Sequence, residues 1–479
     1  MRIYLAVGLL ISLFSTQSYS ENIRLAEVAK AMGVEKINSL EFVGSGSVFS
    51  FGQAFEPGER WPRFVQRSYR ASMNYQTNSM RLSQVRSQGE HPPRGGGAQA
   101  VAADQETIQI VSDQYAWQEI DSKAIPNNGA AKERLRQLWI SPQGVIKAAI
   151  RHSANITGNT LIFQLNGTEI KVSINSQNLV EKVQYLTSNE VTGDYQVEVY
   201  YSDYANFSGI RFPKHILQKE DGYPTLDIQI QELKVNTALP ITVPEGVKNS
   251  PAQTLKLTTD KLAEGIWYLS TPNARNWAVD LGDEIAIVEG FGSEARSLLV
   301  LEEIKRLIPN KPIRYVINTH HHYDHAGGLR TYVAQGATIV THAMNQPFFE
   351  KSWARPRTIA PDSLSRNPRE AQFETLTDKK IISGKSRTIE LYYMKDTSHA
   401  KYNLIVFIPE EGLAYWGDGY NPPAGNNPFD IARTPEQGID IYRVIKMNKI
   451  DVKTIAPAHG AGPKPFSYFL MGMGLPLAE

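Results

Sequence analysis

A short run of metal-binding side chains, between Thr319 and Gly328, constrains the fold of this chain more than any other part of its 479 residues. The run reads THHHYDHAGG, and three of its four imidazoles and one carboxylate are candidate ligands within six positions: His320, His322, Asp324 and His325. Imidazole plus carboxylate is the ligand set that suits zinc, iron and manganese rather than calcium or magnesium. We therefore expect a site for such a metal here, and a fold that brings further ligands to it.

The residues around this run predict a strand, a loop and a helix. Ile313 to Asn318 (IRYVIN) is β-branched, aromatic and apolar, as expected of a strand that is buried on both faces. Gly327 and Gly328 allow a tight turn before a helix that we expect from Leu329 to Ala334. In open α/β sheets the functional groups gather at the carboxyl ends of strands, so the loop should hold its side chains at such an end.

Three positions downstream repeat this design, in which an apolar run ends in a turn that carries a metal-binding side chain. Four side chains are too few to hold two ions in good order, so further His or Asp residues at strand ends are expected. The candidates are His399 in KDTSHAKYN, Asp418 in YWGDG and His459 in APAHG. We expect all three to lie beside the first loop in the folded chain.

The combined pattern resembles the metallo-β-lactamase superfamily, whose HxHxDH motif is followed by a distant His, an Asp and a last His. The similarity runs from about Thr254 to the C-terminus, and it implies an α+β chain in which residues 254–479 form an αββα sandwich with two divalent metal ions. By the same resemblance, Asp418 bridges the ions and the other ligands divide between them: His320, His322 and His399 at one ion, and Asp324, His325 and His459 at the other. Zinc is the expected metal, with iron or manganese as alternatives.

Two segments depart from the superfamily pattern. The strand that usually ends in an aspartate reads IAIVEGFG here, with Glu289 in the acidic position. Since the resemblance gives that residue the task of orienting ligands, we expect the site to keep its metals. The segment after the third histidine, Ala400 to Asn403, is not the usual small turn, and it leaves Lys401, Tyr402 and Asn403 as candidate substrate contacts.

The expected metal pair predicts a hydrolytic reaction. Two bridged ions would lower the pKa of a bound water from about 15.7 toward about 7 and supply a bridging hydroxide as nucleophile. The resemblance implies that Asp324 serves both as ligand and as catalytic proton carrier. The chain has no cysteine and keeps Asp418, which favours a lactone, thioester, phosphodiester or sulfate ester as substrate over a β-lactam. A β-lactamase, a single-iron oxygenase and an apolar-ligand-binding protein with an accessory metal domain are the alternatives.

Two polar loops are candidate walls of a substrate pocket. The stretch from Phe348 to Leu364 is too irregular for one element and is expected to cover the pocket as a lid. Within it, Trp353, Arg355 and Arg357 are candidate contacts for an anionic or aromatic substrate, with simple solvation as the alternative. The loop from Asn421 to Asp430 is the second expected wall.

The remaining histidines have simpler interpretations. His321 stands between two ligands, so its side chain should face away from them in a structural role. His342 follows an expected strand and is a weaker candidate for the pocket. His152 and His215 are expected in the core, and His91 in an exposed loop.

The start of the chain predicts a signal peptide that is cleaved near Ser20. Met1 and Arg2 form a short cationic end, and the apolar run that follows is shorter than the ~20 residues of a membrane span. A membrane anchor is the alternative. Because the chain also lacks cysteine and hence any disulfide framework, we expect a bacterial periplasmic or secreted protein with no integral membrane span.

Length and charge set limits on the architecture and on the partners. A chain of 479 residues exceeds what one core usually supports, so two or more domains are expected. The net charge of +1 provides no field that would draw in nucleic acid. A small-molecule substrate is therefore expected, and the oligomeric state stays open.

Residues 21–250 are expected to form a separate β-rich domain, joined to the metal domain by a proline-rich linker from Ala238 to Pro251. Local patterns predict helices and one flexible loop: helices at Glu21–Val34, Ala130–Trp139 and Gln143–Ile150, and the loop at Ser87–Ala103. Alternating apolar and polar residues predict an antiparallel meander, with strands at Thr160–Ser173, Leu179–Thr187, Asp194–Ser202 and Thr225–Val235. This pattern weakly resembles the half-barrel sheet of periplasmic lipoprotein-carrier proteins.

Overall fold

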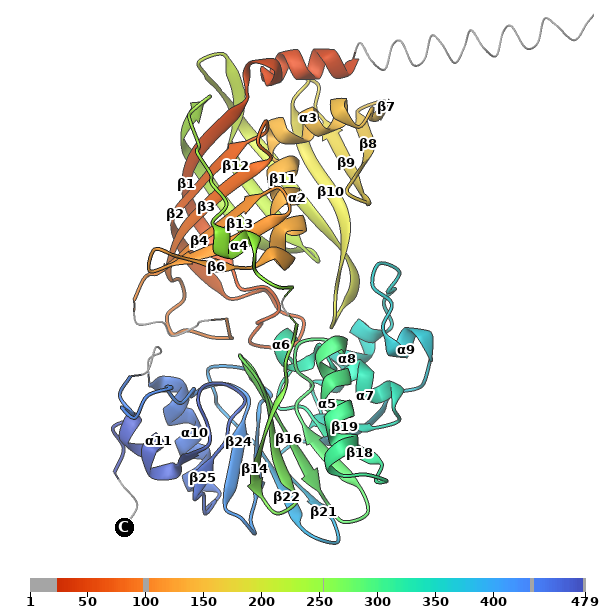
Figure 1. Cartoon of the computed structure of the whole chain (residues 1–479), viewed down its shortest axis with the longest axis vertical. Coiled ribbons are helices and arrows are strands. Elements are labelled where there is room, and N and C mark those ends of the chain that lie inside the picture. Colours follow the sequence, from red (N-terminus) through yellow and green to blue (C-terminus); the bar gives the residue numbers. More distant parts are fainter. Residues whose placement is uncertain (1–23, 98–102, 253, 431–434, 477–479) are drawn as a thin grey trace, which may run out of the picture.

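The computed structural model describes residues 24–97, 103–252, 254–430 and 435–476. Figure 1 shows two β-rich parts, one above the other. We call them the N-terminal domain, residues 24–235, and the C-terminal domain, residues 258–476. The expected signal peptide lies outside the described residues.

The N-terminal domain is built on one antiparallel sheet of 13 strands. Strands β6 to β1 lie in order on one side, strands β13 to β7 lie in order on the other, and β1 pairs with β13 between them. The expected antiparallel meander is therefore confirmed, and it is wider than the sequence patterns indicate. The strands are β1 (Ser39–Phe49), β2 (Arg63–Asn74), β3 (Ser79–Gln88), β4 (Gln105–Ser112), β5 (Tyr115–Ile120), β6 (Lys123–Pro126), β7 (Asn155–Thr157), β8 (Thr160–Leu165), β9 (Thr168–Ile174), β10 (Val180–Asn189), β11 (Gly193–Phe207), β12 (Ile210–Glu220) and β13 (Tyr223–Val235).

One expected strand is two strands in the structure. The range Thr160–Ser173 is divided by a turn at Asn166 and Gly167, whose φ angles are +51° and +80°, so it forms the hairpin of β8 and β9. Asparagine and glycine tolerate such left-handed angles, which is why this pair favours a two-residue hairpin turn. The prediction missed this turn signal.

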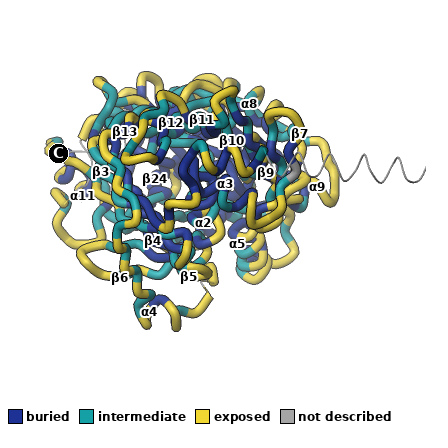
Figure 2. Tube along the Cα trace, turned by 90° about the horizontal axis from the view of Figure 1, so that it is seen from above, coloured by how far each residue is buried: buried dark blue, intermediate teal, exposed yellow. Residues whose placement is uncertain are grey.

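Helices α2 (Ala131–Ile140) and α3 (Pro142–Arg151) confirm the two helices expected in the middle of this domain. Figure 2, which views the molecule from above, shows both helices within the curve of the sheet. Leu138, Val145 and Ile146 on these helices join apolar strand residues in one buried cluster. The core of the N-terminal domain therefore lies on the concave side of the sheet. The part of the expected N-terminal helix that is described is helical over residues 24–32.

The C-terminal domain is a sandwich of two sheets with helices outside them, as expected (Figure 1). Trp277, Leu391 and Tyr415 belong to the apolar cluster between a sheet of 7 strands and a sheet of 6 strands. Helices α5 (Glu294–Leu307) and α7 (Leu329–Ala334) pack on the first sheet. Helices α10 (Glu436–Met447) and α11 (Phe466–Gly472) pack on the second. The first sheet contains β14 (Thr258–Ala263), β15 (Ile266–Thr271), β16 (Ala274–Asp280), β17 (Ile285–Val288), β18 (Ile313–Ile317), β19 (Thr338–His342) and β20 (Gln372–Leu376).

The second sheet and the helices complete this domain. The second sheet contains β21 (Lys379–Ser383), β22 (Thr388–Tyr393), β23 (Leu404–Ile408), β24 (Leu413–Trp416), β25 (Thr454–Ile455) and β26 (Lys464–Pro465). The helices are α5 (Glu294–Leu307), α6 (Tyr323–Ala326), α7 (Leu329–Ala334), α8 (Gln346–Trp353), α9 (Ser363–Arg366), α10 (Glu436–Met447) and α11 (Phe466–Gly472). Strand β18 and helix α7 confirm the strand and the helix expected on either side of the histidine loop.

The segment between the domains contains a short helix, α4 (Glu245–Lys248), within the expected linker. Its Val247 is buried with Ile110 and Trp117 of the N-terminal sheet, so the linker is anchored on that domain. Among the residues that the structure describes, no helix is both long enough and apolar enough to span a bilayer.

Candidate metal centre

The histidine loop and the three downstream residues meet at one end of the sandwich. His320 and His322 follow β18, and α6 carries Asp324 and His325. The downstream residues stand in loops after β22, β24 and β25: His399, Asp418 and His459 respectively. Each position follows a strand, which is why they were expected to converge, and the structure brings all of them together.

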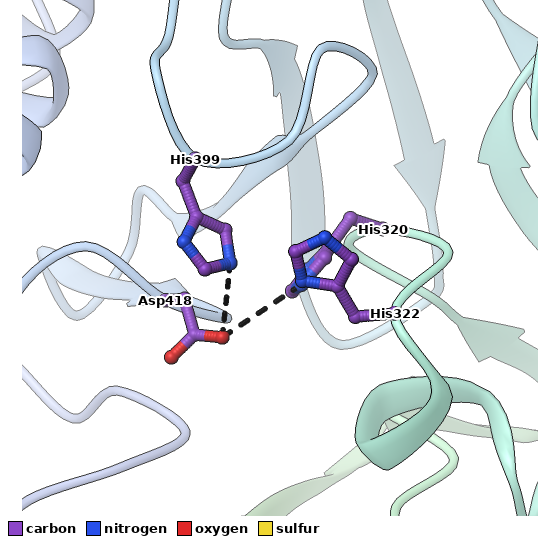
Figure 3. A group of neighbouring side chains, drawn as sticks. All are labelled: His320, His322, His399 and Asp418. Carbon is purple, nitrogen blue, oxygen red and sulfur yellow. Dashed lines mark hydrogen bonds and ion pairs between the residues drawn. The ribbon is translucent and has the colours of Figure 1, made fainter. Parts of the chain in front are cut away.

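One group of four buried side chains consists of His320, His322, His399 and Asp418, whose potential ligand atoms all lie within 4.8 Å of one another (Figure 3). The Oδ2 atom of Asp418 lies 3.0 Å from Nε2 of His399 and 3.8 Å from Nε2 of His320. Nε2 of His320 is in turn 3.0 Å from Nδ1 of His322. Three ring nitrogens and a carboxylate oxygen therefore face one point.

A second group consists of Asp324, His325, Asp418 and His459. Nε2 of His325 lies 3.1 Å from Oδ2 of Asp418 and 3.2 Å from Nε2 of His459. It is also 3.5 Å from Oδ2 of Asp324. Asp418 belongs to both groups, so its carboxylate is shared between two sets of potential ligands.

Hydrogen bonds on the outer side of the rings decide which nitrogen faces inward. Nε2 of His322 lies 2.9 Å from the carbonyl oxygen of Ala54, and Nδ1 of His459 lies 2.5 Å from that of Asn273. A carbonyl oxygen only accepts, so these nitrogens carry the proton of a neutral ring. The other nitrogens, Nδ1 of His322 and Nε2 of His459, then present lone pairs to the cluster. Such a set of imidazole nitrogens and carboxylate oxygens suits a divalent metal ion.

Burial and the neighbouring imidazoles hold the pKa values of His320 and His322 well below their usual range. Burial alone would raise the pKa of Asp418, but His399 and His459 hold it well below its usual range. Neutral imidazoles beside an ionised carboxylate are the protonation states that metal ligands need.

Glu289 is fully buried beneath this cluster and meets it in two places. Its Oε1 accepts a hydrogen bond of 3.0 Å from the backbone N–H of Thr319, and its Oε2 lies 3.6 Å from Nδ1 of His325. Burial lowers the pKa of His325, but Asp324 and Glu289, together with Asp418, raise it well above its usual range. These carboxylates therefore favour positive charge at this point, which a bound cation would also supply.

Three contributors from the N-terminal domain were missed by the sequence analysis. Nε2 of Gln53 donates a 2.7 Å hydrogen bond to Oδ1 of Asp324. The carbonyl of Ala54 accepts from Nε2 of His322 and also, at 3.0 Å, from Nε2 of His321. Gly96 lies against the ring of His322. The only sequence signal was the run RGGG that includes Gly96, which was interpreted as part of a flexible loop.

His321 has the structural role expected for it, since it points to Ala54 and belongs to neither group of four. Burial lowers its pKa to about 3, so the ring is neutral. His342 also lies outside both groups, and its ring stacks on Tyr402 at a centroid distance of 4.8 Å.

Among the other histidines, His215 was expected in the core. It instead pairs with Asp227 at 2.8 Å on a partly exposed part of the N-terminal sheet, because its imidazole has a carboxylate partner there. His152 is exposed at the end of α3, and its ring stacks on that of Phe163, so it is not a core residue either.

The segment that was expected to form a lid, residues 348–364, contacts the N-terminal domain and the core of the C-terminal domain. Arg355 makes a 2.7 Å ion pair with Asp221, and Arg357 donates to the backbone carbonyls of the β10–β11 turn, residues 189–191. Trp353 stacks on Phe349 and on Phe373 in the core of the C-terminal domain. Arg355 and Arg357 therefore join the two domains and Trp353 packs in the core, while their role as substrate contacts stays a prediction.

The segment after His399 also faces the N-terminal domain. Nζ of Lys401 makes a 2.6 Å ion pair with Glu56, and the hydroxyl of Tyr402 lies 3.5 Å from the same carboxylate. Asn403 is buried, and its Oδ1 accepts from the backbone N–H of Leu404 at 2.8 Å, so this oxygen is used at the start of β23. The role of Lys401, Tyr402 and Asn403 as substrate contacts stays a prediction.

The loop from Asn421 to Asp430 lies beside the turn that follows His459. The N–H of Ala461 donates to the carbonyl of Pro422 at 2.7 Å, and Gly460 approaches the backbone of Asn421 and Pro422. The loop therefore lies next to a candidate ligand, and its role as the second wall of a pocket stays a prediction.

The C-terminal domain therefore combines two overlapping groups of potential metal ligands with a two-sheet sandwich. Residues 275–459 match the metallo-beta-lactamase superfamily. The C-terminal half of the chain therefore carries a domain of that superfamily, and the chain is a metal-dependent hydrolase. The match begins at residue 275, so it gives no support to the expected likeness of the N-terminal domain to lipoprotein carriers.

Solved structures similar to this chain include three metallo-beta-lactamases. The protein from Pontibacter korlensis is 19% identical, with a TM-score of 0.34, and the match covers 46% of this chain and 98% of that one. FIM-1 from Pseudomonas aeruginosa, in a mono-zinc form, is 18% identical, with a TM-score of 0.35 and coverage of 46% and 94%. The protein from Erythrobacter litoralis is 18% identical, with a TM-score of 0.35 and coverage of 47% and 97%.

Proposed function

We propose that the chain is a periplasmic or secreted hydrolase with two metal ions that cleaves an ester-like bond in a small molecule: a lactone, thioester, phosphodiester or sulfate ester. The observation that carries this proposal is the position of Asp418, which belongs to both groups of ligands. His320, His322 and His399 would hold one ion, and Asp324, His325 and His459 the other. Zinc is the proposed metal, with iron or manganese as alternatives.

The side chains of the centre have different tasks in this proposal. When bound, two divalent ions supply a Lewis acid and an activated water for hydrolysis. The side chain of Asp324 is 45% exposed, whereas that of Asp418 is 6% exposed, so Asp324 is the carboxylate that substrate and water reach. We assign to Asp324 the transfer of a proton from the attacking water to the leaving group. Asp418 is held between the imidazoles and fixes the spacing of the centre.

The proposed class of substrate rests on the ligand set. The chain contains no cysteine, and it keeps an aspartate at the shared position, which favours ester-like bonds. A β-lactam is the alternative substrate. A panel of lactone, thioester, phosphodiester, sulfate-ester and β-lactam substrates, assayed on metal-loaded protein, separates these possibilities by their kcat/KM values.

The proposed domain limits are 21–250 for the β-rich domain and 254–479 for the catalytic domain, after a signal peptide of residues 1–20. The mass of the protein purified from a periplasmic extract tests the last point. A chain that begins at Glu21 supports cleavage near Ser20, and an uncleaved chain contradicts it.

The first test of the function is metal content. Purified protein should hold close to two equivalents of zinc, iron or manganese, and Asp418→Ala should lose at least about 100-fold in ester-hydrolase turnover while keeping its circular dichroism spectrum. His215→Ala removes an imidazole of the N-terminal sheet and serves as the matched control, with metal content and turnover as in wild type. Wild-type turnover in Asp418→Ala would reject the shared-ligand mechanism.

A second function is favoured by a cavity in the N-terminal domain. It has a volume of about 260 Å³ and is lined mainly by apolar and aromatic side chains, among them Phe42, Tyr69, Tyr201, Ile216 and Ile228. Such a lining suits a small apolar ligand. This function predicts that the protein binds an apolar fluorescent probe in a 1:1 complex and that a fatty acid displaces the probe. The Asp418→Ala variant should bind the probe as wild type does. No binding would contradict it.

A further inference from the structure

The contact between Gln53 and Asp324 crosses from one domain to the other. The residues are 271 positions apart, and the amide of Gln53 donates its 2.7 Å hydrogen bond to Oδ1 of Asp324. The other oxygen, Oδ2, faces the metal-binding cluster, 3.5 Å from Nε2 of His325 and 3.8 Å from Nε2 of His459. The amide therefore fixes which oxygen of a half-exposed carboxylate is turned inward.

The next residue, Ala54, makes the second contact. Its carbonyl oxygen accepts from Nε2 of His322, which places the ring proton on the outer side and leaves Nδ1 toward the cluster. The imidazole of His321 donates to the same oxygen at 3.0 Å. Ala54 is 2% exposed, so water does not replace its carbonyl as a partner.

A glycine turn of the N-terminal domain holds this dipeptide in place. The N–H of Gly96 donates to the carbonyl of Gln53 at 3.0 Å, and the N–H of Gly95 donates to the carbonyl of Ser398 at 3.0 Å, next to the candidate ligand His399. A Cβ atom on Gly96 would lie 2.0 Å from Oε1 of Gln53 and 2.7 Å from Cε1 of His322. Only glycine allows this approach, which leaves the dipeptide little room to move.

We propose that Gln53 and Ala54, supplied by the N-terminal domain, are positioning residues of the metal centre. Gln53 holds Asp324 for binding through a single oxygen, and Ala54 holds His322 for binding through Nδ1. The C-terminal domain alone therefore contains every ligand but not every contact that orients them. This inference rests on the proposed metal-binding function, and it gives the β-rich domain a direct part in that function.

The test compares metal affinity between variants of the full chain. Gln53→Leu keeps a side chain of similar size but removes the donor to Asp324. Asp221→Asn weakens another contact between the domains, the ion pair with Arg355, and touches no residue of the centre. Competition with a chromophoric zinc chelator measures the affinity of each ion, and circular dichroism and thermal melting check the fold.

Gln53→Leu should weaken the binding of one of the two zinc ions by about 10- to 100-fold and leave the other unchanged. Asp221→Asn should bind both ions as wild type does. Gly96→Ala displaces the same dipeptide, and combining it with Gln53→Leu should add little to the loss that either variant causes alone.

Two results would overturn the inference. One is unchanged affinity for both ions in Gln53→Leu, and the other is an equal loss in Asp221→Asn, which would show that general loosening of the interface is the cause. Neither result affects the proposed function, because wild type would still hold two ions. The proposed function itself fails in a separate measurement, if wild type binds no pair of ions.

Discussion

Glu289 has a left-handed backbone conformation, with φ of +76°, although it is a buried residue with a long side chain. Such a conformation costs about 1–3 kcal/mol and persists only where the surroundings hold it. Its carboxylate here reaches both the N–H of Thr319 and the ring of His325. The strained position thus places a carboxylate directly beneath the histidine loop, the orienting role that the sequence analysis expected of it.

The variant Glu289→Gln tests that role. Glutamine has nearly the same size and still offers an oxygen to Thr319, but it places no charge opposite Nδ1 of His325. We expect metal affinity to fall by about 10- to 100-fold with little change in melting temperature. Chelator competition and thermal melting measure the two quantities. Affinity equal to that of wild type would show that the charge of Glu289 does not serve the centre.

At the scale of elements, helices α7 and α9 are tied together by a buried ion pair. Arg330 of α7 binds the carboxylate of Asp362 with hydrogen bonds of 2.5 and 3.1 Å, and the same carboxylate accepts from the backbone N–H of Ser365 at the start of α9. Burial raises the pKa of Asp362, but the bonds from Arg330 and Ser365 hold it well below its usual range. This pair fixes α9 against α7. It also holds the segment that carries Arg357 near α7, because Nε of Arg357 lies 3.8 Å from the same carboxylate.

Asp362→Asn should lower the free energy of unfolding by about 3–5 kcal/mol at neutral pH, because it leaves the charge of Arg330 buried without its partner. The folded carboxyl has the depressed pKa, so its stabilisation is present above the unfolded pKa of about 3.9 and is lost as the pH falls toward the folded value. The difference between variant and wild type should therefore shrink in acid. Urea unfolding at pH 7 and at about pH 3 measures it. A difference that stays constant with pH would contradict the assignment.

Some features of the site could be predicted from the sequence, and others could not. The ligand positions were predictable because each lies in the segment that follows an apolar strand, and strand ends on one side of a sheet meet. The roles of Arg355 and Arg357 were not, because their partners are Asp221 and three carbonyls that lie more than a hundred positions earlier. Gln53 carries no local pattern at all, and only the fold brings it to Asp324.

At the scale of the whole molecule, residues of both domains contact the metal centre, so removal of metal should destabilise both domains. A ligand at about 100 times its dissociation constant stabilises the folded state by about 2.7 kcal/mol, and chelation should therefore lower the melting temperature by several degrees. We also expect faster hydrogen exchange after chelation in residues 50–56, which contain Gln53 and Ala54. The hairpin of β8 and β9 lies near the far edge of the 13-stranded sheet and serves as the internal control.

Hydrogen exchange followed by mass spectrometry resolves these segments. Faster exchange that is confined to the C-terminal domain would contradict a centre shared by the two domains. Faster exchange in residues 160–174 as well would indicate general loosening instead.

The two edge strands of the wide N-terminal sheet are its shortest strands. β6 has 4 residues and includes Pro126, and β7 has 3 residues, whereas β11 near the middle has 15. Proline has no N–H to offer, and a border of three or four residues gives an incoming strand very few backbone groups to join. A molecule shaped in this way can display a large curved surface at high concentration and still resist growth into fibres by strand addition.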